Sequence, residues 1–260
     1  MDKQSIILER VITEYIDRHE PISSKYLQNR LGIKISSATI RYYFKKLTQK
    51  GYLQKEHLSS GRIPSPISLK EFWRKKLKEK SYIIKKMEQL EKGAREEPIF
   101  CEYTLFDESM LVGLENYKDR FLVAYFESGE FVVPYNAKVH KIFEGLVGKT
   151  GLEISEVCKD IGLVGLGVRL KEFLEREFKV FNLCELVELA RQNEEWAKED
   201  LQKVCSGEEL YRQKAGLRFL GNFLNYKFYL DINHKTKAEV LLMGHLDRNY
   251  LKVIQNLKKE

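Results

Sequence analysis

The stretch that most constrains the fold of this chain is residues 36–65, SSATIRYYFKKLTQKGYLQKEHLSSGRIPS. Ser36 or Ser37 can open it as a helix cap, because a serine hydroxyl accepts free backbone N–H groups of a first helical turn. The apolar residues that follow recur at helical spacing and mark one buried face: Ile40, Phe44 and Leu47. Gly51 is a typical helix stop, so the sequence predicts a helix that ends near residue 50.

Two short extended runs follow this helix, one from Tyr52 to His57 and a second that reaches Pro64. The turn between them, Ser59-Ser60-Gly61-Arg62, places an arginine near the tip of a hairpin. A basic helix followed by a two-stranded hairpin is typical of the reading half of a winged helix-turn-helix.

Two further helices are predicted upstream of the basic helix. The first covers residues 5–19 with a buried apolar stripe, and Pro21 ends it because the residue before a proline is pushed out of the helical region. Ser23 or Ser24 caps the second, which stops at Gly32. In a helix-turn-helix the earlier helix braces the later one in the major groove, so this spacing favours a DNA-binding head.

The outward face of the basic helix is the expected contact with DNA. Arg41 suits the O6 and N7 atoms of guanine, whereas Ser37 and Thr39 suit phosphates. Arg62 is expected to enter a narrow minor groove, and the start of the second upstream helix offers backbone N–H groups to a phosphate. The alternative is an ordinary solvated helix face. The predicted DNA contacts are Ser24, Lys25, Ser36, Ser37, Ala38, Thr39, Arg41, Tyr42, Lys45, Ser59, Ser60 and Arg62.

Charge is divided unevenly along the chain. Residues 1–95 carry 22 lysines and arginines against 10 acidic residues, a net charge of +12. The remaining residues carry 23 against 28, a net charge of −5. Such an excess favours a polyanionic partner for the N-terminal part alone.

The runs SSATIR and HLSSGRIPS closely resemble the signature of HrcA, the heat-inducible transcription repressor family of bacteria. The run EYIDRHEPISSKYL is similar to the same family's junction between its first two helices. Near the end, LLMGHLDRNYLKVI is similar to the family's closing segment of strand, glycine and helix. The sequence departs from the family at Tyr42, where Asn is common, at His245, where Pro is usual, and at Asp247-Arg248, where Arg-Met is usual.

The resemblance implies a multidomain α+β chain with an N-terminal winged helix-turn-helix, then a GAF-like α/β sheet domain with a helical dimerisation insert. The expected division is a winged-helix domain over residues 1–70, a basic helical connector over 71–95, a GAF-like domain over 96–150 and 206–260, and an inserted dimerisation segment over 151–205.

Beyond the head, hydrophobic periodicity and turn residues predict the remaining elements. The turn Ser128-Gly129 separates two strands of a hairpin, and Pro134 favours an edge position for the second strand. The predicted strands are 121–127, 131–135 and 239–243, and the predicted helices are 69–92, 139–147, 152–161, 168–177, 184–204, 210–224 and 247–257.

Several functional classes lack their sequence signals. Cys101, Cys158, Cys184 and Cys205 are widely spaced, which is typical of reduced, buried cytoplasmic thiols and not of a zinc site. We expect no enzyme, because the catalytic and nucleotide-binding motifs are missing, and the glycine-rich run at residues 162–167 is interpreted as a loop. No secretion signal precedes the first helix, and no apolar run approaches the ~18 residues of a membrane span. We therefore expect a cytoplasmic protein without cofactor or metal.

The leading hypothesis is a dimeric repressor that binds an inverted-repeat operator in double-stranded DNA. The resemblance further implies control of chaperone and chaperonin operons, release on heat shock and assistance by the chaperonin GroEL. The charge division also suggests a stable dimeric half that carries an independently tethered reading head. Two alternatives remain open at this point: a winged-helix regulator controlled by a small molecule in its C-terminal domain, and an RNA-binding or membrane-surface protein that uses the basic connector.

Overall fold

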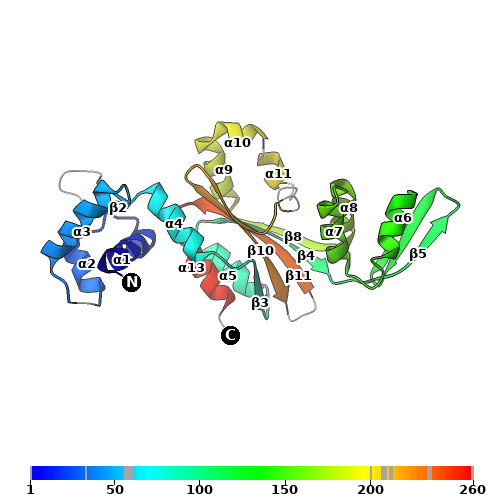
Figure 1. Ribbon diagram of the computed structural model, residues 1–260, viewed down its shortest axis with the longest axis horizontal. Helices are drawn as coiled ribbons and strands as arrows, with labels where there is room; N and C mark the ends of the chain where they lie inside the picture. The colour runs from blue at the N-terminus through cyan, green and yellow to red at the C-terminus, as the bar shows by residue number, and fades with distance from the viewer. Residues whose placement is uncertain are drawn as a thin grey trace.

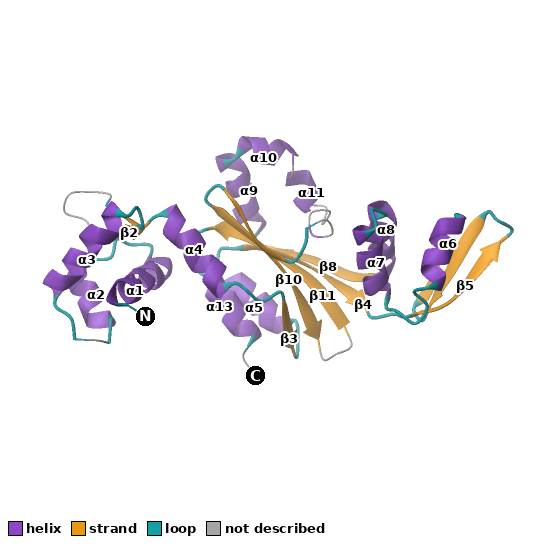
Figure 2. Cartoon of the chain, in the orientation of Figure 1, coloured by secondary structure: helices purple, strands orange, loops and turns teal. Residues whose placement is uncertain are grey.

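The chain folds into three parts that follow one another along an elongated molecule (Figure 1). The computed structural model describes residues 2–32, 34–55, 61–199, 201–205, 210, 213–232 and 236–258. A helical head lies at one end, a large twisted sheet with helices lies in the middle, and a small sheet with its own helices lies at the other end (Figure 2). The class is mixed α+β with several sheets, as the sequence predicts.

Three helices and one strand pair make up the head. Each helix begins at a side-chain cap, since Asp2, Ser23 and Ser36 each accept a backbone N–H group of the first turn. The elements are α1 (Lys3–Arg18), α2 (Ser24–Arg30), α3 (Ser37–Gln49), β1 (Leu53–Gln54) and β2 (Ile63–Pro64). The two strands pair antiparallel. The core of the head consists of Ile7, Val11, Ile22, Leu27, Ile40, Phe44, Leu47 and Leu53.

A single helix, α4 (Pro66–Lys76), leads from the head to the six-stranded central sheet. The strand order is β3-β10-β11-β4-β8, and β9 also pairs with β10. Only β3 is parallel to its neighbour among the described pairs of this sheet. The bounds are β3 (Ser81–Ile84), β4 (Phe100–Asp107), β8 (Glu175–Phe181), β9 (Gly216–Leu220), β10 (Phe223–Ile232) and β11 (Thr236–His245).

Helices cover both faces of the central sheet (Figure 1). On one face α5 (Glu88–Glu96) and α13 (Tyr250–Leu257) pack against alternate residues of the long strands. The opposite face packs against α9 (Leu183–Gln192), α10 (Glu194–Glu199) and α11 (Leu201–Cys205). This alternation follows from the two-residue period of a strand, which sends neighbouring side chains to opposite faces.

The outer part, which we call the insert, lies between β4 and β8 in the sequence. Its strands form an antiparallel three-stranded sheet in the order β5-β6-β7. Its elements are β5 (Leu111–Tyr117), β6 (Phe121–Phe126), β7 (Gly129–Pro134), α6 (Ala137–Glu144), α7 (Gly151–Asp160) and α8 (Val164–Leu174). Residues from all six elements build one apolar cluster, which includes Leu122, Phe131, Phe143, Ile154 and Leu170.

The structure divides the chain differently from the sequence expectation. The helix predicted over residues 69–92 is wrong, because α4, β3 and α5 share this stretch. Tyr82 and Ile84 point into the main core while Ser81 and Ile83 point away, which is the period of a strand that pairs with β10. The insert was expected at residues 151–205, whereas residues 111–174 share one core and β8 returns to the central sheet.

Strand pairing explains two further corrections. The helix predicted over residues 210–224 is wrong, because β9 and β10 form a hairpin in which Gly221 adopts a φ of +58°. The helix predicted over residues 168–177 ends at Leu174, where β8 begins beside β4. The hairpin over residues 121–135 is confirmed as β6 and β7, and the closing strand and helix are confirmed as β11 and α13.

The thiols divide into two pairs. Cys101 and Cys158 are buried, as expected, and burial raises the pKa of Cys158 to about 11. Cys184 and Cys205 are exposed, which corrects the expectation for those two.

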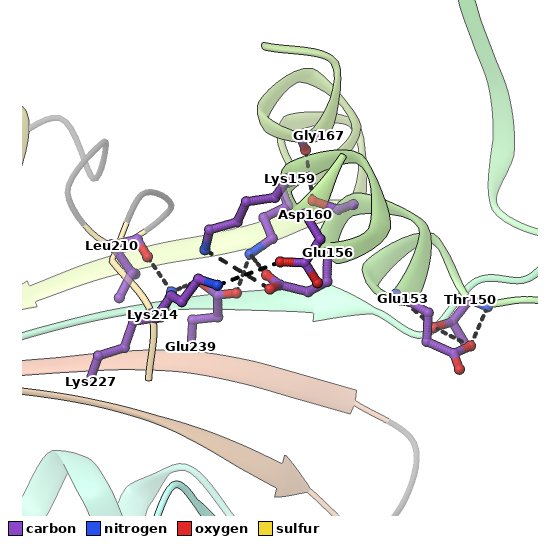
Figure 3. A network of polar contacts seen from close by, with 12 residues as sticks. Thr150, Glu153, Glu156, Lys159, Asp160, Gly167, Leu210, Lys214, Lys227 and Glu239 are labelled. Carbon is purple, nitrogen blue, oxygen red and sulfur yellow. Dashed lines mark hydrogen bonds and ion pairs between the residues drawn. The ribbon is translucent and has the colours of Figure 1, made fainter. Parts of the chain in front are cut away.

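A buried ionic network joins the insert to the central sheet (Figure 3). The two oxygens of Glu239 on β11 contact the ammonium groups of Lys171 on α8 and Lys227 on β10, the latter at 2.7 Å. Glu156 on α7 lies 3.2 Å from the same Lys171 ammonium. Burial lowers the pKa of Lys227 to about 8, while Glu239 opposes this shift. Because removal of one partner leaves a buried charge uncompensated, this network fixes where α8 meets the sheet.

Glu239→Gln should lower the free energy of unfolding by about 3–5 kcal/mol, since two buried ammonium groups would lose their shared carboxylate. The measurement is urea unfolding at neutral pH. Glu144→Gln is the control, because Glu144 is exposed beside His140, and it should change stability by less than about 0.5 kcal/mol. Equal midpoints for both variants would contradict the assigned role of the network.

Candidate nucleic-acid interface

The exposed face of α3 carries the predicted reading residues. Ile40, Phe44 and Leu47 are buried in the head core, which turns the opposite side of the helix outward. Arg41 and Lys45 are exposed there, and Tyr42 is 54% exposed. Ala38 completes this surface with a small side chain that leaves the neighbouring arginine accessible.

Tyr42 is held in place by its neighbours along the helix. The ammonium group of Lys46 lies 4.7 Å from the centre of the Tyr42 ring, and Tyr43 packs edge-on at 5.5 Å. The hydrogen bond with Tyr42 raises the pKa of Lys46. Lys46 was not among the predicted DNA contacts. Its spacing of four residues from Tyr42 is the sequence signal for the contact between the Lys46 ammonium and the Tyr42 ring.

Serine side chains cap the starts of α2 and α3. The Ser36 hydroxyl accepts the backbone N–H of Thr39 at 3.1 Å and contacts the Thr39 hydroxyl at 2.9 Å. Ser23, and not Ser24, caps α2, because its hydroxyl accepts the backbone N–H of Tyr26. Lys25 beside it is exposed. Both helix starts thus carry accessible polar groups that suit phosphate oxygens.

Arg62 lies against the head and not at a free tip. Its backbone exchanges two hydrogen bonds of 2.9 Å with Ile22, and its side chain donates to the Thr48 hydroxyl at 3.3 Å. Gly61 permits this approach, because a Cβ at that position would lie 2.5 Å from the backbone of Ile22. Of the residues predicted on the hairpin, Ser59 and Ser60 lie outside the described part of the chain.

The cations of α4 are partly committed to other contacts. Lys76 forms an ion pair of 2.6 Å with Glu9 of α1, and Arg74 lies 4.9 Å from the ring centre of Phe219 on β9. Lys75 and Lys78 are exposed beside them. This helix therefore joins head and sheet, while some of its cations remain available to a polyanion.

The described residues offer neither a metal site nor a membrane-spanning helix. They contain no cluster of three or more His, Cys, Asp or Glu side chains that could hold a metal ion. Within the same ranges no helix is long and apolar enough to cross a bilayer.

A capped basic helix in an exposed head, held on a mixed α+β body, is typical of a DNA-binding transcription regulator. The chain belongs to the HrcA family, since the family model described as the HrcA C-terminal domain matches residues 73–260. Proteins of two Helicobacter pylori strains, J99 and 26695, both named heat-inducible transcription repressor HrcA, are 27% identical over 266 residues. These matches cover 100% of this chain and 96% of each relative.

Other relatives match over shorter stretches. The heat-inducible transcription repressor HrcA of Ligilactobacillus salivarius is 52% identical over 64 residues, which cover 25% of this chain and 18% of that protein. A crystal structure titled only as a hypothetical protein has the same fold, with a TM-score of 0.51 and 20% identity. That likeness covers 99% of this chain and 94% of the other. The relatives are named for repression of transcription and not for a reaction.

Arg41→Ala should reduce discrimination between operator and scrambled duplex by about 1–3 kcal/mol, because a bidentate contact with guanine is worth that much. Competition binding at one fixed salt concentration measures the ratio. Lys50→Ala is the matched control, since it removes one exposed positive charge at the far end of α3. If both variants keep the wild-type ratio, Arg41 does not read a base.

Proposed function

We propose that this chain is a repressor that controls heat-shock chaperone and chaperonin operons by binding an inverted-repeat operator in double-stranded DNA. The observation that carries the proposal is the exposed face of α3, where Arg41, Tyr42 and Lys45 stand on a helix whose opposite side is buried. The pairing of β1 with β2, and of Arg62 with Ile22, supports reading the head as a winged helix-turn-helix. The relatives' name as heat-inducible repressors supports the link to heat shock.

We propose further that the repressor is a homodimer joined through the outer face of the insert sheet. The inner face of that sheet is buried in the insert core, while the outer face exposes Tyr117, Phe121 and Val132 beside the carboxylates of Glu115 and Glu130. Val123 pairs with Val132, and Phe121 pairs with Pro134 on one side and Tyr117 on the other. Since an inverted repeat has twofold symmetry, a self-complementary apolar face suits a twofold dimer.

Heat would act on the non-local part of this structure. The central sheet pairs β11 with β4 and β10 with β3, so its strands meet across more than a hundred residues. Such pairing forms slowly and leaves apolar surface exposed during folding. In this proposal the chaperonin GroEL assists folding of the body in the cytoplasm, and damaged proteins that compete for GroEL relieve repression.

The test is binding of purified protein to duplexes from upstream of chaperonin operons. The protein should bind them at least about 10³-fold tighter than scrambled duplex, with a steep salt dependence. Binding should fall after a mild heat step and recover with chaperonin and ATP. RNA and anionic vesicles are the competing polyanions, and equal binding to either of them would contradict the proposal.

Val123→Lys combined with Val132→Lys should convert the dimer to a monomer. Each subunit would bring two positive charges into the interface, where they would face the same two charges of the other subunit. Sedimentation at several protein concentrations measures the state. Val187→Lys on α9 is the control, since Val187 is 44% exposed away from the insert. An unchanged dimer in the double variant would move the interface elsewhere.

A second candidate function is favoured by one cavity. It has a volume of about 730 Å³ and lies between β3, β10, β11 and α7, with Tyr82, Phe106, Leu152, Val157 and Leu230 among its apolar lining residues. Charged residues of the ionic network, Glu156, Lys171 and Glu239, line the same cavity, so it suits a small, largely apolar molecule that carries a polar or charged group. Control by such a ligand would appear as a thermal shift in a metabolite screen and a change in operator affinity.

A further inference from the structure

The loop between β11 and α13 contacts the end of α1 through Asp17 and contacts α4 through Trp73. We propose that this contact, which we call the head joint, fixes the direction of the head and thereby selects the spacing of the two operator half-sites. The head joint consists of Asp17, His19, Trp73 and the loop Leu246–Asn249. The inference rests on the proposed function, because it concerns how two heads of one dimer meet one operator.

Apolar burial makes the head continuous with the body. Ile7 and Val11 of α1 belong to the head core, whereas Ile12 and Ile16 on the same helix belong to the core of the central sheet. Leu8 packs against both cores. This corrects the expectation of an independently tethered head, because α1 cannot tilt without opening one of the two cores.

Trp73 of α4 is the centre of the joint. Its side chain is fully buried, and its indole N–H donates to the backbone carbonyl of Leu246 at 2.7 Å. Its ring packs edge-on against Tyr250 at the start of α13, with 5.1 Å between centres. The indole thus fixes α4 in both distance and direction against the closing loop of the body.

Polar contacts hold the end of α1 against the same loop. The Asn249 side chain donates to Asp17 at 2.6 Å, although the two residues are 232 positions apart. The Asn249 oxygen also accepts the backbone N–H of Lys252, so this residue caps α13 as well. His19, which ends α1 with a φ of +54°, lies 3.8 Å from Asp247.

The closing loop is also braced from the body side. Arg248 lies 3.3 Å from Glu185 of α9, and the His245 ring contacts Gln192 of the same helix at 2.8 Å. The loop is therefore held between α9 and α1. The positions at which this segment departs from the family pattern, His245 and Asp247-Arg248, are the ones that make these contacts.

A rigid joint has a consequence for operator choice. Domains joined only by small polar contacts move by default, whereas a packed apolar joint whose direction is set by specific polar contacts, such as that of Asn249 with Asp17, holds one orientation. In a dimer, two rigid heads present their α3 helices at one separation and one rotation. Each base pair added between half-sites turns one of them by about 35° around the duplex, so few spacer lengths fit both heads.

The test measures operator affinity against spacer length. Wild-type protein is bound to inverted repeats whose spacer is the native length, one or two base pairs shorter, one or two longer, and half a helical turn longer. We expect affinity to fall at least about tenfold for a change of two base pairs.

Asn249→Asp is the variant that loosens the joint. It keeps an oxygen that can cap α13, but it places a second carboxylate against Asp17. The spacer penalty should shrink to about threefold or less, while binding to a single half-site stays unchanged. The swap Asp17→Asn with Asn249→Asp restores an amide–carboxylate pair and should restore the wild-type profile. Trp73 fluorescence in a Trp196→Phe background reports whether the joint has opened.

The outcomes separate the two proposals. Wild-type protein without preference for any inverted repeat would overturn the proposed function before a variant is made. A wild-type profile in Asn249→Asp, together with altered Trp73 fluorescence, would overturn the head joint as the source of spacing. If Asn249→Asp does not fold, the folded swap variant decides, because a flat profile in that protein also overturns the proposal.

Discussion

Burial of Trp73 is the interaction on which the arrangement of the molecule depends. This indole joins a helix that starts in the head, the carbonyl of the closing loop and the first aromatic ring of α13. Ile12 and Ile16 of α1 belong to the same core as Trp73, and Leu8 packs against both this core and the head core, so that one helix links the two cores. This contact connects a part of the chain with a net charge of +12, residues 1–95, to a remainder with a net charge of −5.

The insert, at the other end of the molecule, is attached to the central sheet in a different way. The insert has a core of its own and meets the central sheet at buried ion pairs rather than through a shared apolar core alone. A buried charge is costly without its partner, so the ion pairs of Lys171 and Lys227 with Glu239 favour one position of α8 against the sheet. Packing around Trp73 therefore holds the head against the central sheet, whereas the ion pairs of Glu239 hold the insert against it.

These two attachments bear directly on repression. A repressor of an inverted repeat needs a dimer contact and a reading helix at a defined distance from each other. In this chain the apolar outer face of β5–β7 and the exposed face of α3 lie at opposite ends of the elongated molecule (Figure 1). Every contact between them, from the Glu239 network to Trp73, contributes to how two heads would be placed on DNA.

Local signals in the sequence by themselves determined the head. Caps at Ser23 and Ser36, helical spacing of Ile40, Phe44 and Leu47, and a stop at Gly51 depend on residues within one or two turns, so α2 and α3 begin and end where predicted. The strongly alternating hairpin of β6 and β7 and the closing strand and helix were accessible for the same reason. Only the tertiary structure decided the rest. The strands β3 and β8 gain their stability from partners far along the chain, and β9 gains it from its hairpin with β10, so periodicity alone assigned these segments wholly or in part to helices. Arg62 is turned from an expected hairpin tip onto Thr48 by a backbone pairing with Ile22, and Asn249 reaches Asp17 across almost the whole chain. Such contacts depend on which surfaces the completed cores bring together, and no window of the sequence contains that information.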